Sequence, residues 1–301
     1  MVTNSSNIKS NSKSKLLFPE SGITKNDLVL YYDRIASYML PYVKNRPLTM
    51  QRFPKGIHQE GFFQKHVPNY FPDWIQTEEI RKVGGWVNHV ICNSKETLLY
   101  LVNQYVITFH IALSTIDNIQ CPDRLIFDLD PPKGDFHLAI EGARELRNLL
   151  ENKLGFKAFL MTTGSKGLHV IVPLKQKESF EEVHAFAKAV SIYISSSNPD
   201  KYTTAIRKVK REGRLYIDFL RNSYAQTSVA PFSVRAIENA PVATPISWME
   251  LDNLSLSPQL FTIKNIFKRL DIVHDPWDSF RANAKPIGTA NEKLVALFTK
   301  L

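Results

Sequence analysis

The amino-acid sequence predicts an α+β protein whose central part is a ferredoxin-like β-α-β-β-α-β unit. Two patterns predict this class. Short segments in which apolar and polar residues alternate indicate strands, and longer segments with apolar residues three or four positions apart indicate helices. Their order along the chain is that of a split β-α-β arrangement. The expected strands cover 125–130, 156–162, 168–174 and 214–220, and the expected helices cover 136–153 and 179–195.

The segments before this unit predict a module of mixed structure. An amphipathic helix is expected from residue 23 onward, with Lys25 at its start and Pro41 at its end, because proline lacks the amide hydrogen that a helix interior uses. A basic, loop-rich stretch follows. A second helix over 95–104 then leads into a strand-like stretch at 106–114.

We expect one folded domain over residues 17–301, preceded by a disordered basic arm at 1–16. The arm has no hydrophobic centre and is therefore not a secretory signal. The patterns divide the domain into an N-terminal module at 17–120, a catalytic module at 121–235 and a proline-containing helical segment at 236–301.

Composition narrows the classes of function. No apolar run is long enough to span a bilayer, and the formal net charge is +9. A basic surface suits polyanions, nucleic acid first and an anionic membrane second, although many basic proteins bind no nucleic acid. Cys92 and Cys121 are isolated, which argues against a zinc site or a disulfide framework and fits a reducing cytoplasm.

The most informative segment is LIFDLDPP at 125–132, where alternation places Asp128 and Asp130 on one face of a strand. Their repulsion must be offset by positive charge, and a pair of divalent cations is one answer. A strand end in solvent is the other. In the predicted sheet the last strand lies near the first, so Asp218 joins the same face. Three acids distant in sequence favour the metal site, and two cations suit nucleotidyl transfer.

The turn TTGSKGLH, from Thr162 to His169, supplies groups that suit phosphate. Glycines let the backbone approach an anion, and Ser165, Lys166 and His169 offer donors. The spacing matches neither a Walker loop nor a dinucleotide fingerprint. A glycine-bearing hairpin is the alternative. Beside the acidic cluster, phosphate binding is the better interpretation.

For the other candidate residues, the sequence pattern alone does not distinguish a functional role from a structural one. His110 lies on an apolar strand, where a satisfied core histidine is the usual explanation, and Arg235 could point into the acidic site. Basic residues with aromatic residues nearby suit phosphates and stacked bases, but a solvated basic face would look similar. These residues include Arg52, Phe62, Phe63, Lys65, Arg207, Lys208, Lys210 and Arg211.

Eight motifs in order resemble the polymerase domain of bacterial ATP-dependent DNA ligase D, a member of the archaeo-eukaryotic primase superfamily. They are GITKNDLVLYY, RPLTMQRFPKGI, GFFQKHVP, FHIALS, LIFDLDPP, TTGSKGLHV, YIDFLRN and APFSVRA. The resemblance covers about residues 17–277, nearly the whole folded chain, and it implies a primase-like fold with an RRM-like catalytic sheet.

The resemblance also implies roles for individual residues. Asp128, Asp130 and Asp218 would be the catalytic acids that hold two Mn²⁺ or Mg²⁺ ions. The nucleotide would be bound by His110, Thr163, Ser165, Lys166, His169, Arg235 and Arg52, with Thr163 at a position where serine is more usual. DNA would be bound by Phe62, Phe63, Lys65, Lys15, Lys25 and Arg211; Phe62 and Phe63 would pack on the template, and Lys15 and Lys25 would contact a 5′-phosphate.

By the same resemblance the chain fills gaps and extends ends in non-homologous end joining, favours ribonucleotides over deoxyribonucleotides as NTP or dNTP substrates, and lies in the cytoplasm at the nucleoid. The sequence has no ligase-type KxDG motif, so we expect either a stand-alone polymerase or an excised domain. A stand-alone polymerase would need a ligase and Ku as separate partners. The alternatives are a primase that makes primers de novo, a metal-dependent nuclease and a non-catalytic binding module. Carboxylates would repel the phosphates that a binding module needs.

Overall fold

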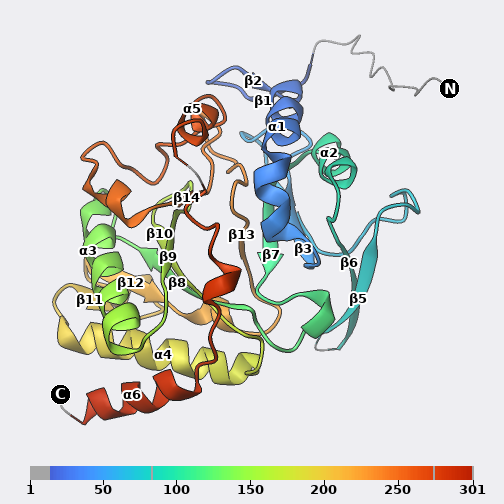
Figure 1. The fold of residues 1–301 in the computed structure, drawn as a ribbon. Coiled ribbons are helices and arrows are strands. Elements are labelled where there is room, and N and C mark those ends of the chain that lie inside the picture. Colours follow the sequence, from blue (N-terminus) through green and yellow to red (C-terminus); the bar gives the residue numbers. More distant parts are fainter. Residues whose placement is uncertain (1–13, 83, 274, 300–301) are drawn as a thin grey trace.

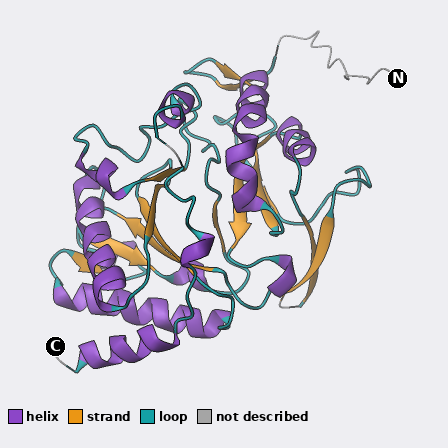
Figure 2. Cartoon of the chain, in the orientation of Figure 1, coloured by secondary structure: helices purple, strands orange, loops and turns teal. Residues whose placement is uncertain are grey.

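The computed structural model describes residues 14–82, 84–273 and 275–299, and their strands gather mainly into two sheets, each covered by helices (Figure 1, Figure 2). The helices are α1 (Lys25–Val43), α2 (Lys95–Asn103), α3 (Phe136–Arg147), α4 (Phe180–Ser197), α5 (Ile266–Leu270) and α6 (Gly288–Phe298). The strands are β1 (Leu16–Phe18), β2 (Ile23–Thr24), β3 (Leu48–Arg52), β4 (Phe62–Gln64), β5 (Thr77–Lys82), β6 (Gly85–Val90), β7 (Val106–Ala112), β8 (Arg124–Asp130), β9 (Phe159–Thr162), β10 (Leu168–Pro173), β11 (Tyr202–Thr203), β12 (Leu215–Asp218), β13 (Thr227–Val229) and β14 (Thr244–Ile246). Within the described ranges, no helix is both long and apolar enough to cross a membrane.

The sheet that carries the predicted acids has the strand order β11-β12-β8-β10-β9-β14. Its four middle strands, β12, β8, β10 and β9, pair antiparallel with one another. This is the order that a ferredoxin-like unit gives, so the α+β class and the central unit are confirmed. Strand β11 adds a parallel neighbour at one edge, and β14 pairs with β9 at the other.

Strand β8 separates two cores. Leu125, Phe127 and Leu129 are fully buried in the core that helices α3 and α4 share with this sheet, and each such side chain contributes about 1.5–3 kcal/mol on burial. The alternate residues point to the opposite face, where Ile126 belongs to the core of the other sheet. Asp128 and Asp130 continue that face. The alternation in the sequence therefore aims both carboxylates away from α3 and α4.

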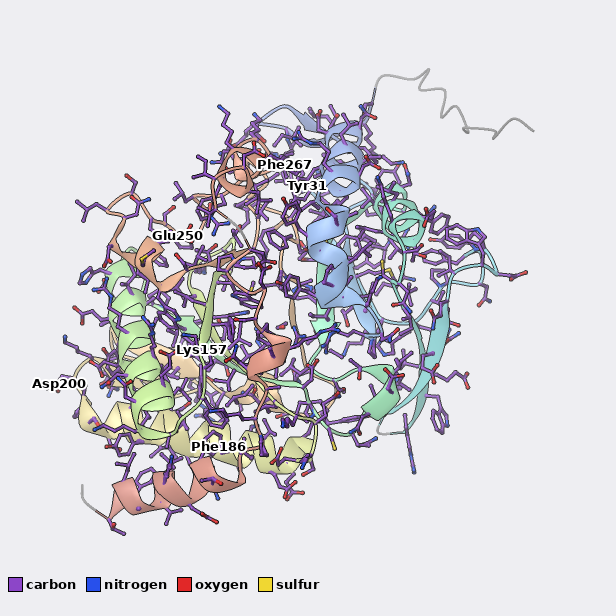
Figure 3. All side chains as sticks on the ribbon, in the orientation of Figure 1. Tyr31, Lys157, Phe186, Asp200, Glu250 and Phe267 are labelled. Atoms are coloured by element: carbon purple, nitrogen blue, oxygen red, sulfur yellow. The ribbon has the colours of Figure 1, made fainter. Side chains whose placement is uncertain are left out.

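The second sheet has the order β13-β7-β3-β4, and helices α1 and α2 pack near it. Tyrosines of α1 fix the helix by buried hydrogen bonds: the hydroxyl of Tyr32 donates to the carbonyl of Ile107 at 2.7 Å, and that of Tyr31 donates to the carbonyl of Phe232 at 2.7 Å. The ring of Tyr31 also lies 5.9 Å from that of Phe267 in α5 (Figure 3). These contacts join α1 to the C-terminal half of the chain.

The three zones expected from the sequence are interleaved in space. Strand β13 falls within 121–235, yet it pairs with β7 in the sheet of the N-terminal module. Strand β14 falls within 236–301, yet it extends the catalytic sheet. The edge of a sheet offers unpaired backbone groups to any suitable segment, and a pattern along the chain does not reveal which segment takes it.

Helix α1 begins as expected and ends later. The hydroxyl of Thr24 accepts a hydrogen bond from the amide of Asp27, whose carboxylate accepts one from the amide of Thr24, a complete capping box. The helix runs past Pro41 to Val43, which corrects the predicted end. A proline in the last turn removes only one amide bond, and Tyr42 and Val43 beyond it are buried.

The segment at 236–301 contains less helix than expected. Five prolines between residues 241 and 286 exclude long helices, so the segment has β14, the five-residue α5 and the longer α6. Trp277 anchors it by donating its indole N–H to the carbonyl of Leu160 in β9 at 3.0 Å. The helix expected over 136–153 is also divided, because α3 ends at Arg147 and a π-helical turn follows at Asn148–Lys153.

The predicted arm is shorter than 1–16 on its C-terminal side. Residues 1–13 lie outside the described residues. Leu16 belongs to β1, where it pairs with Thr24 of β2, and the carbonyl of Lys15 accepts a hydrogen bond from the amide of Lys25 at 2.8 Å. The hairpin thus brings Lys15 beside the first residue of α1.

Candidate active site

The three predicted acids occupy one face of two neighbouring strands. Asp128 of β8 and Asp218 of β12 are directly opposite in the antiparallel register, and Tyr216 is opposite Asp130. On the other side of β8, His169 of β10 is opposite Asp128. Because opposed residues of antiparallel strands share a face, a row of side chains from three strands is centred on Asp128. The expected convergence of Asp218 on the other two acids is confirmed at the level of strand register.

The carboxylates perturb one another. Burial, the charge of Asp128 and that of Asp218 raise the pKa of Asp130 to about 6, against an opposing effect of Arg211. Burial is also the main cause of a raised pKa for Asp218, with Asp128 contributing. Burial acts in the same direction on Asp128, but His169 and Arg221 outweigh it and lower its pKa. Because burial and mutual repulsion disfavour the ionised forms of Asp130 and Asp218, a bound cation would stabilise this cluster.

Two partners touch Asp128 directly. The Nε2 atom of His169 lies 3.4 Å from its Oδ1 atom, and the Nε atom of Arg221 lies 3.4 Å from its Oδ2 atom. The carboxylate of Asp218 instead accepts the amide of Leu220 at 2.8 Å. Arg221 escaped the sequence interpretation because it stands in a one-turn 3-10 helix, Leu220–Asn222, that no periodic pattern marks.

The TTGSKGLH turn joins β9 to β10 and is ordered by Thr163. Its hydroxyl donates to the carbonyl of Gly167 at 3.1 Å and accepts the amides of Ser165 at 3.3 Å and Gly167 at 3.2 Å. Gly164 has a φ of 65°, which favours glycine. Thr163 therefore shapes the turn with its hydroxyl already engaged, while Ser165 and the exposed Lys166 reach the cavity beside the acids.

His110 comes from β7 in the other sheet and faces the same cavity. Its Nδ1 atom is buried and has no hydrogen-bond partner among the described residues. Burial is the main reason that the pKa of His110 falls to about 3, with Arg235 and Arg221 adding to the effect. The imidazole is neutral near pH 7, and its buried Nδ1 atom calls for a partner that a ligand could supply.

Between the two sheets lies a cavity of about 150 Å³ in which most of the predicted nucleotide residues meet. Its lining is His110, Asp128, Asp130, Thr163, Ser165, Lys166, His169, Arg221, Thr227, Ser228, Val229 and Arg235. Of the residues predicted for the acidic and nucleotide sites, Asp218 and Arg52 are not in this lining. Sequence reasoning missed Arg221 and the three residues of β13.

Arg52 lies in a different environment from the one we expected. Its Nε atom donates to the carbonyl of Gln104 at 2.8 Å, and its Nη1 atom donates to Gln64 at 2.6 Å and to the hydroxyl of Tyr70 at 2.8 Å. Its guanidinium carbon is 5.6 Å from the centre of the Phe62 ring. These bonds use its Nε and Nη1 atoms to support the β3–β4 hairpin, outside the lining of the cavity beside the acids, and its contact with nucleotide stays a prediction.

The predicted template residues form an exposed edge. Phe62 and Phe63 of β4 are 46% and 63% exposed, and the Phe63 ring lies 5.5 Å from that of His110. Lys65, just beyond β4, lines a separate cavity of about 80 Å³ under the β5–β6 hairpin, which shares Thr227 with the first cavity. The exposed rings thus adjoin the histidine of the nucleotide cavity.

Arg211 lies beside the acids. Its guanidinium stacks over Tyr216, with its carbon 3.8 Å from the ring centre, and its Nη1 atom is 4.0 Å from Asp130. It also donates to the carbonyls of Ala205 and Ile206 at 3.2 Å. The predicted role in DNA binding is untested by these contacts, which show that Arg211 offsets the charge of Asp130.

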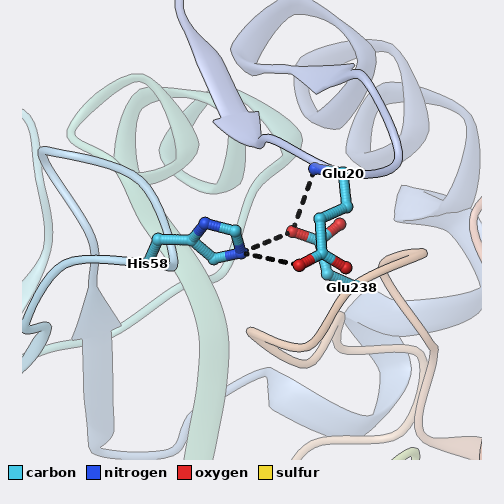
Figure 4. A group of neighbouring side chains, drawn as sticks. All are labelled: Glu20, His58 and Glu238. Atoms are coloured by element: carbon cyan, nitrogen blue, oxygen red, sulfur yellow. Dashed lines mark hydrogen bonds and ion pairs between the residues drawn. The ribbon is translucent and has the colours of Figure 1, made fainter.

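A second group of metal-type ligands lies away from the acids. Of the described residues, Glu20, His58 and Glu238 have potential ligand atoms within 4.8 Å of one another (Figure 4), and the three aspartates form no group as close. Glu238 already accepts hydrogen bonds from the amides of Glu20 and Ser21 and from the hydroxyl of Ser21. These contacts hold the turn between β1 and β2 against the C-terminal segment at Glu238.

The family described as LigD, primase-polymerase domain, matches residues 24–277. The chain is 34% identical over 274 residues to the bifunctional non-homologous end joining protein LigD of Bacillus subtilis, covering 90% of this chain and 44% of that protein. It is 33% identical over 280 residues to the multifunctional protein LigD of Pseudomonas aeruginosa, covering 92% of this chain and 33% of that one. The chain thus spans less than half the length of these relatives.

A solved structure agrees with the sequence matches. The polymerase domain of Mycobacterium tuberculosis ligase D, in complex with DNA, superposes with a TM-score of 0.83 at 29% identity, over 92% of this chain and 100% of that one. With a family match across most of the chain and the primase-like sheet in place, the resemblance read from the motifs is confirmed. The chain belongs to the LigD primase-polymerase domain family.

Proposed function

We propose that this chain is a template-dependent nucleotidyltransferase that extends primer ends and fills gaps in DNA during non-homologous end joining. The observation that carries the proposal is the row of three carboxylates on β8 and β12, two of which, Asp128 and Asp130, line a cavity that also holds phosphate-type donors. The names of the LigD relatives support its assignment to end joining.

Asp128, Asp130 and Asp218 would hold two Mg²⁺ or Mn²⁺ ions. An all-carboxylate donor set suits these hard cations, and the raised pKa values of Asp130 and Asp218 fit a site that a positive charge would stabilise. When bound, such ions lower the pKa of an attacking hydroxyl and stabilise the charge on a triphosphate. His169, at 3.4 Å from Asp128, would orient that carboxylate.

The other residues of the cavity either neutralise the triphosphate or recognise the rest of the nucleotide. Lys166, Arg221 and Arg235 supply positive groups to the triphosphate, and the TTGSKGLH turn supplies backbone and the Ser165 hydroxyl. His110, neutral and with an unpartnered Nδ1 atom, would bond to a polar group of the nucleotide. A sugar that carries an additional hydroxyl would satisfy such an atom, which supports a preference for ribonucleotides.

DNA would run past the exposed rings of Phe62 and Phe63, since base–aromatic stacking is tolerant of sequence. At the N-terminal hairpin, the ammonium groups of Lys15 and Lys25 both approach the ring of Tyr105, where a 5′-phosphate at a gap would neutralise them. A ligase activity and Ku would complete the repair reaction.

The test is primer extension on a gapped, 5′-phosphorylated duplex with Mn²⁺, comparing ribonucleotides with deoxyribonucleotides. Asp128→Ala should lower the rate by about 1,000-fold, because the missing carboxylate removes transition-state stabilisation. Asp117→Ala, which removes an exposed acid from the surface, is the matched control and should retain the wild-type rate.

Unchanged extension by Asp128→Ala would contradict the assignment of the active site. Synthesis on unprimed single strands would identify a primase, and degradation of the duplex without added nucleotides would identify a nuclease.

A further inference from the structure

The lysine pair, Lys15 and Lys25, is organised by one aromatic side chain. The ammonium nitrogen of Lys15 lies 5.3 Å from the centre of the Tyr105 ring, and that of Lys25 lies 4.7 Å from it. Both distances are within the range of cation–π attraction. The β1–β2 hairpin joins the lysines at the backbone, where the amide of Lys25 donates to the carbonyl of Lys15. A single aromatic ring therefore attracts two ammonium groups, one from the residue before β1 and one from the first residue of α1.

The backbone of Tyr105 is held in a conformation that bulky residues rarely adopt. Its φ is 66°, in the left-handed region that favours glycine or asparagine. Such conformations persist where the surroundings impose them and concentrate at functional sites. A tyrosine here costs more than a glycine would, and its ring offsets that cost by packing against the hydrophobic core and by contacting the two ammonium groups.

Three hydrogen bonds impose that conformation. The amide of Tyr105 donates to the carbonyl of Val102 at 2.9 Å, and its own carbonyl accepts the amide of Phe53 at 3.0 Å. Arg52 donates to the carbonyl of the preceding Gln104 at 2.8 Å. The ring is therefore fixed to the end of β3, the strand that pairs with the β4 strand carrying the exposed Phe62 and Phe63.

We propose that Tyr105 is a positioning residue that holds the lysine pair ready for a terminal 5′-phosphate and sets its place relative to the template edge. This inference rests on the proposed function, which assigns a gapped DNA substrate to the chain. In the absence of an anion, the ring's electron-rich faces offset the repulsion between the two ammonium groups. When the phosphate arrives, the lysines are already oriented, and less side-chain freedom is lost on binding.

The experiment measures binding of the full chain to gapped duplexes that differ only in a 5′-phosphate or a 5′-hydroxyl at the downstream strand, by fluorescence anisotropy. Tyr105→Gly removes the ring and introduces the residue best suited to a φ of 66°. Because the ring also packs against the hydrophobic core, thermal unfolding of the variant establishes that the fold is retained. The preference for phosphate should fall about fivefold. Tyr105→Phe keeps the ring and should keep the preference within about twofold. Tyr193→Leu, which removes a tyrosine that packs on Phe298 of α6, is the matched control.

A double-mutant cycle distinguishes positioning from general damage. Lys25→Met should lower the phosphate preference in the wild type and have a smaller effect in the Tyr105→Gly background, because both changes remove one interaction. An unchanged preference in Tyr105→Gly, or equal loss of binding to both duplexes, would overturn the role of Tyr105. A wild-type chain with no phosphate preference would instead refute the 5′-phosphate part of the proposed function.

Discussion

Gly167→Ala should disable the proposed phosphate-binding turn, Thr162 to His169, by a clash that the structure defines. A Cβ atom at Gly167 would lie 1.9 Å from the carbonyl oxygen of Leu129 in β8, where real Cβ contacts stay beyond 3.0 Å. Because the obstacle is backbone, the turn must move away from β8 by about 1 Å. Ser165 and Lys166 move with it, away from the acids on either side of Leu129. A misplacement of this size costs about 100-fold in rate.

The assay is steady-state primer extension combined with thermal unfolding. We expect kcat/KM to fall about 100-fold and the free energy of unfolding to fall by about 1–3 kcal/mol, the usual cost of overpacking. Gly288→Ala is the matched control, since a Cβ atom there meets nothing within 4 Å. A Gly167→Ala enzyme with wild-type activity would show that the turn does not hold the triphosphate against β8.

Three further predictions test separate parts of the structure. Arg221→Gln should weaken nucleotide binding about tenfold in isothermal titration calorimetry. Mn²⁺ binding without nucleotide should be no weaker, because Arg221 neutralises Asp128 in the wild-type protein. Equal nucleotide affinity in the variant would refute the role of Arg221. Asp123→Asn should lower the free energy of unfolding by about 3–5 kcal/mol, because it leaves the fully buried Arg46 without its carboxylate. Burial raises the pKa of Asp123, but its two arginine partners lower it by more, so the pKa in the folded protein lies below the unfolded value of about 4. The stability advantage of the wild type is therefore complete above this value and should be lost progressively as the pH falls below it, as urea titrations would measure. Ser179→Ala should cost about 1 kcal/mol in the same titrations by removing the capping box of α4, and a change near zero would contradict that role.

The parts of the fold that the sequence predicted are those set by local periodicity. Alternation in β8 placed Asp128 and Asp130 on one face, and the order of elements placed Asp218 on the adjacent strand, as the register shows. A period of two leaves a strand little freedom once one of its faces is buried. The same reasoning identified Ser165 and Lys166, because a glycine-containing turn between β9 and β10 must lie where these strands end, beside the acid-bearing end of β8.

The parts that escaped prediction depend on contacts between distant segments. The family resemblance implies that Arg52 contacts nucleotide, but the structure shows its Nε and Nη1 atoms donating to Gln104, Gln64 and Tyr70 instead. Tyr105 carries no motif, and its importance emerges only from its φ and from the lysines that approach it. A residue type states which interactions a side chain can make. The fold decides which of them are already satisfied, and that is what separates a structural arginine from a binding one.

The cavity owes its composition to one segment that changes sheets. After Asp218 the chain leaves β12, passes Arg221 in a 3-10 turn, and enters β13, where Val229 is opposite His110 of β7. It then reaches Arg235, which lines the same cavity. The crossing places an acid, two arginines and the neighbour of the histidine on one short stretch, and the two sheets also share a hydrophobic core through residues such as Ile126 and Phe109. Relative motion of the two sheets is correspondingly limited, and we expect nucleotide binding to reorient side chains such as Arg221 more than it moves the sheets.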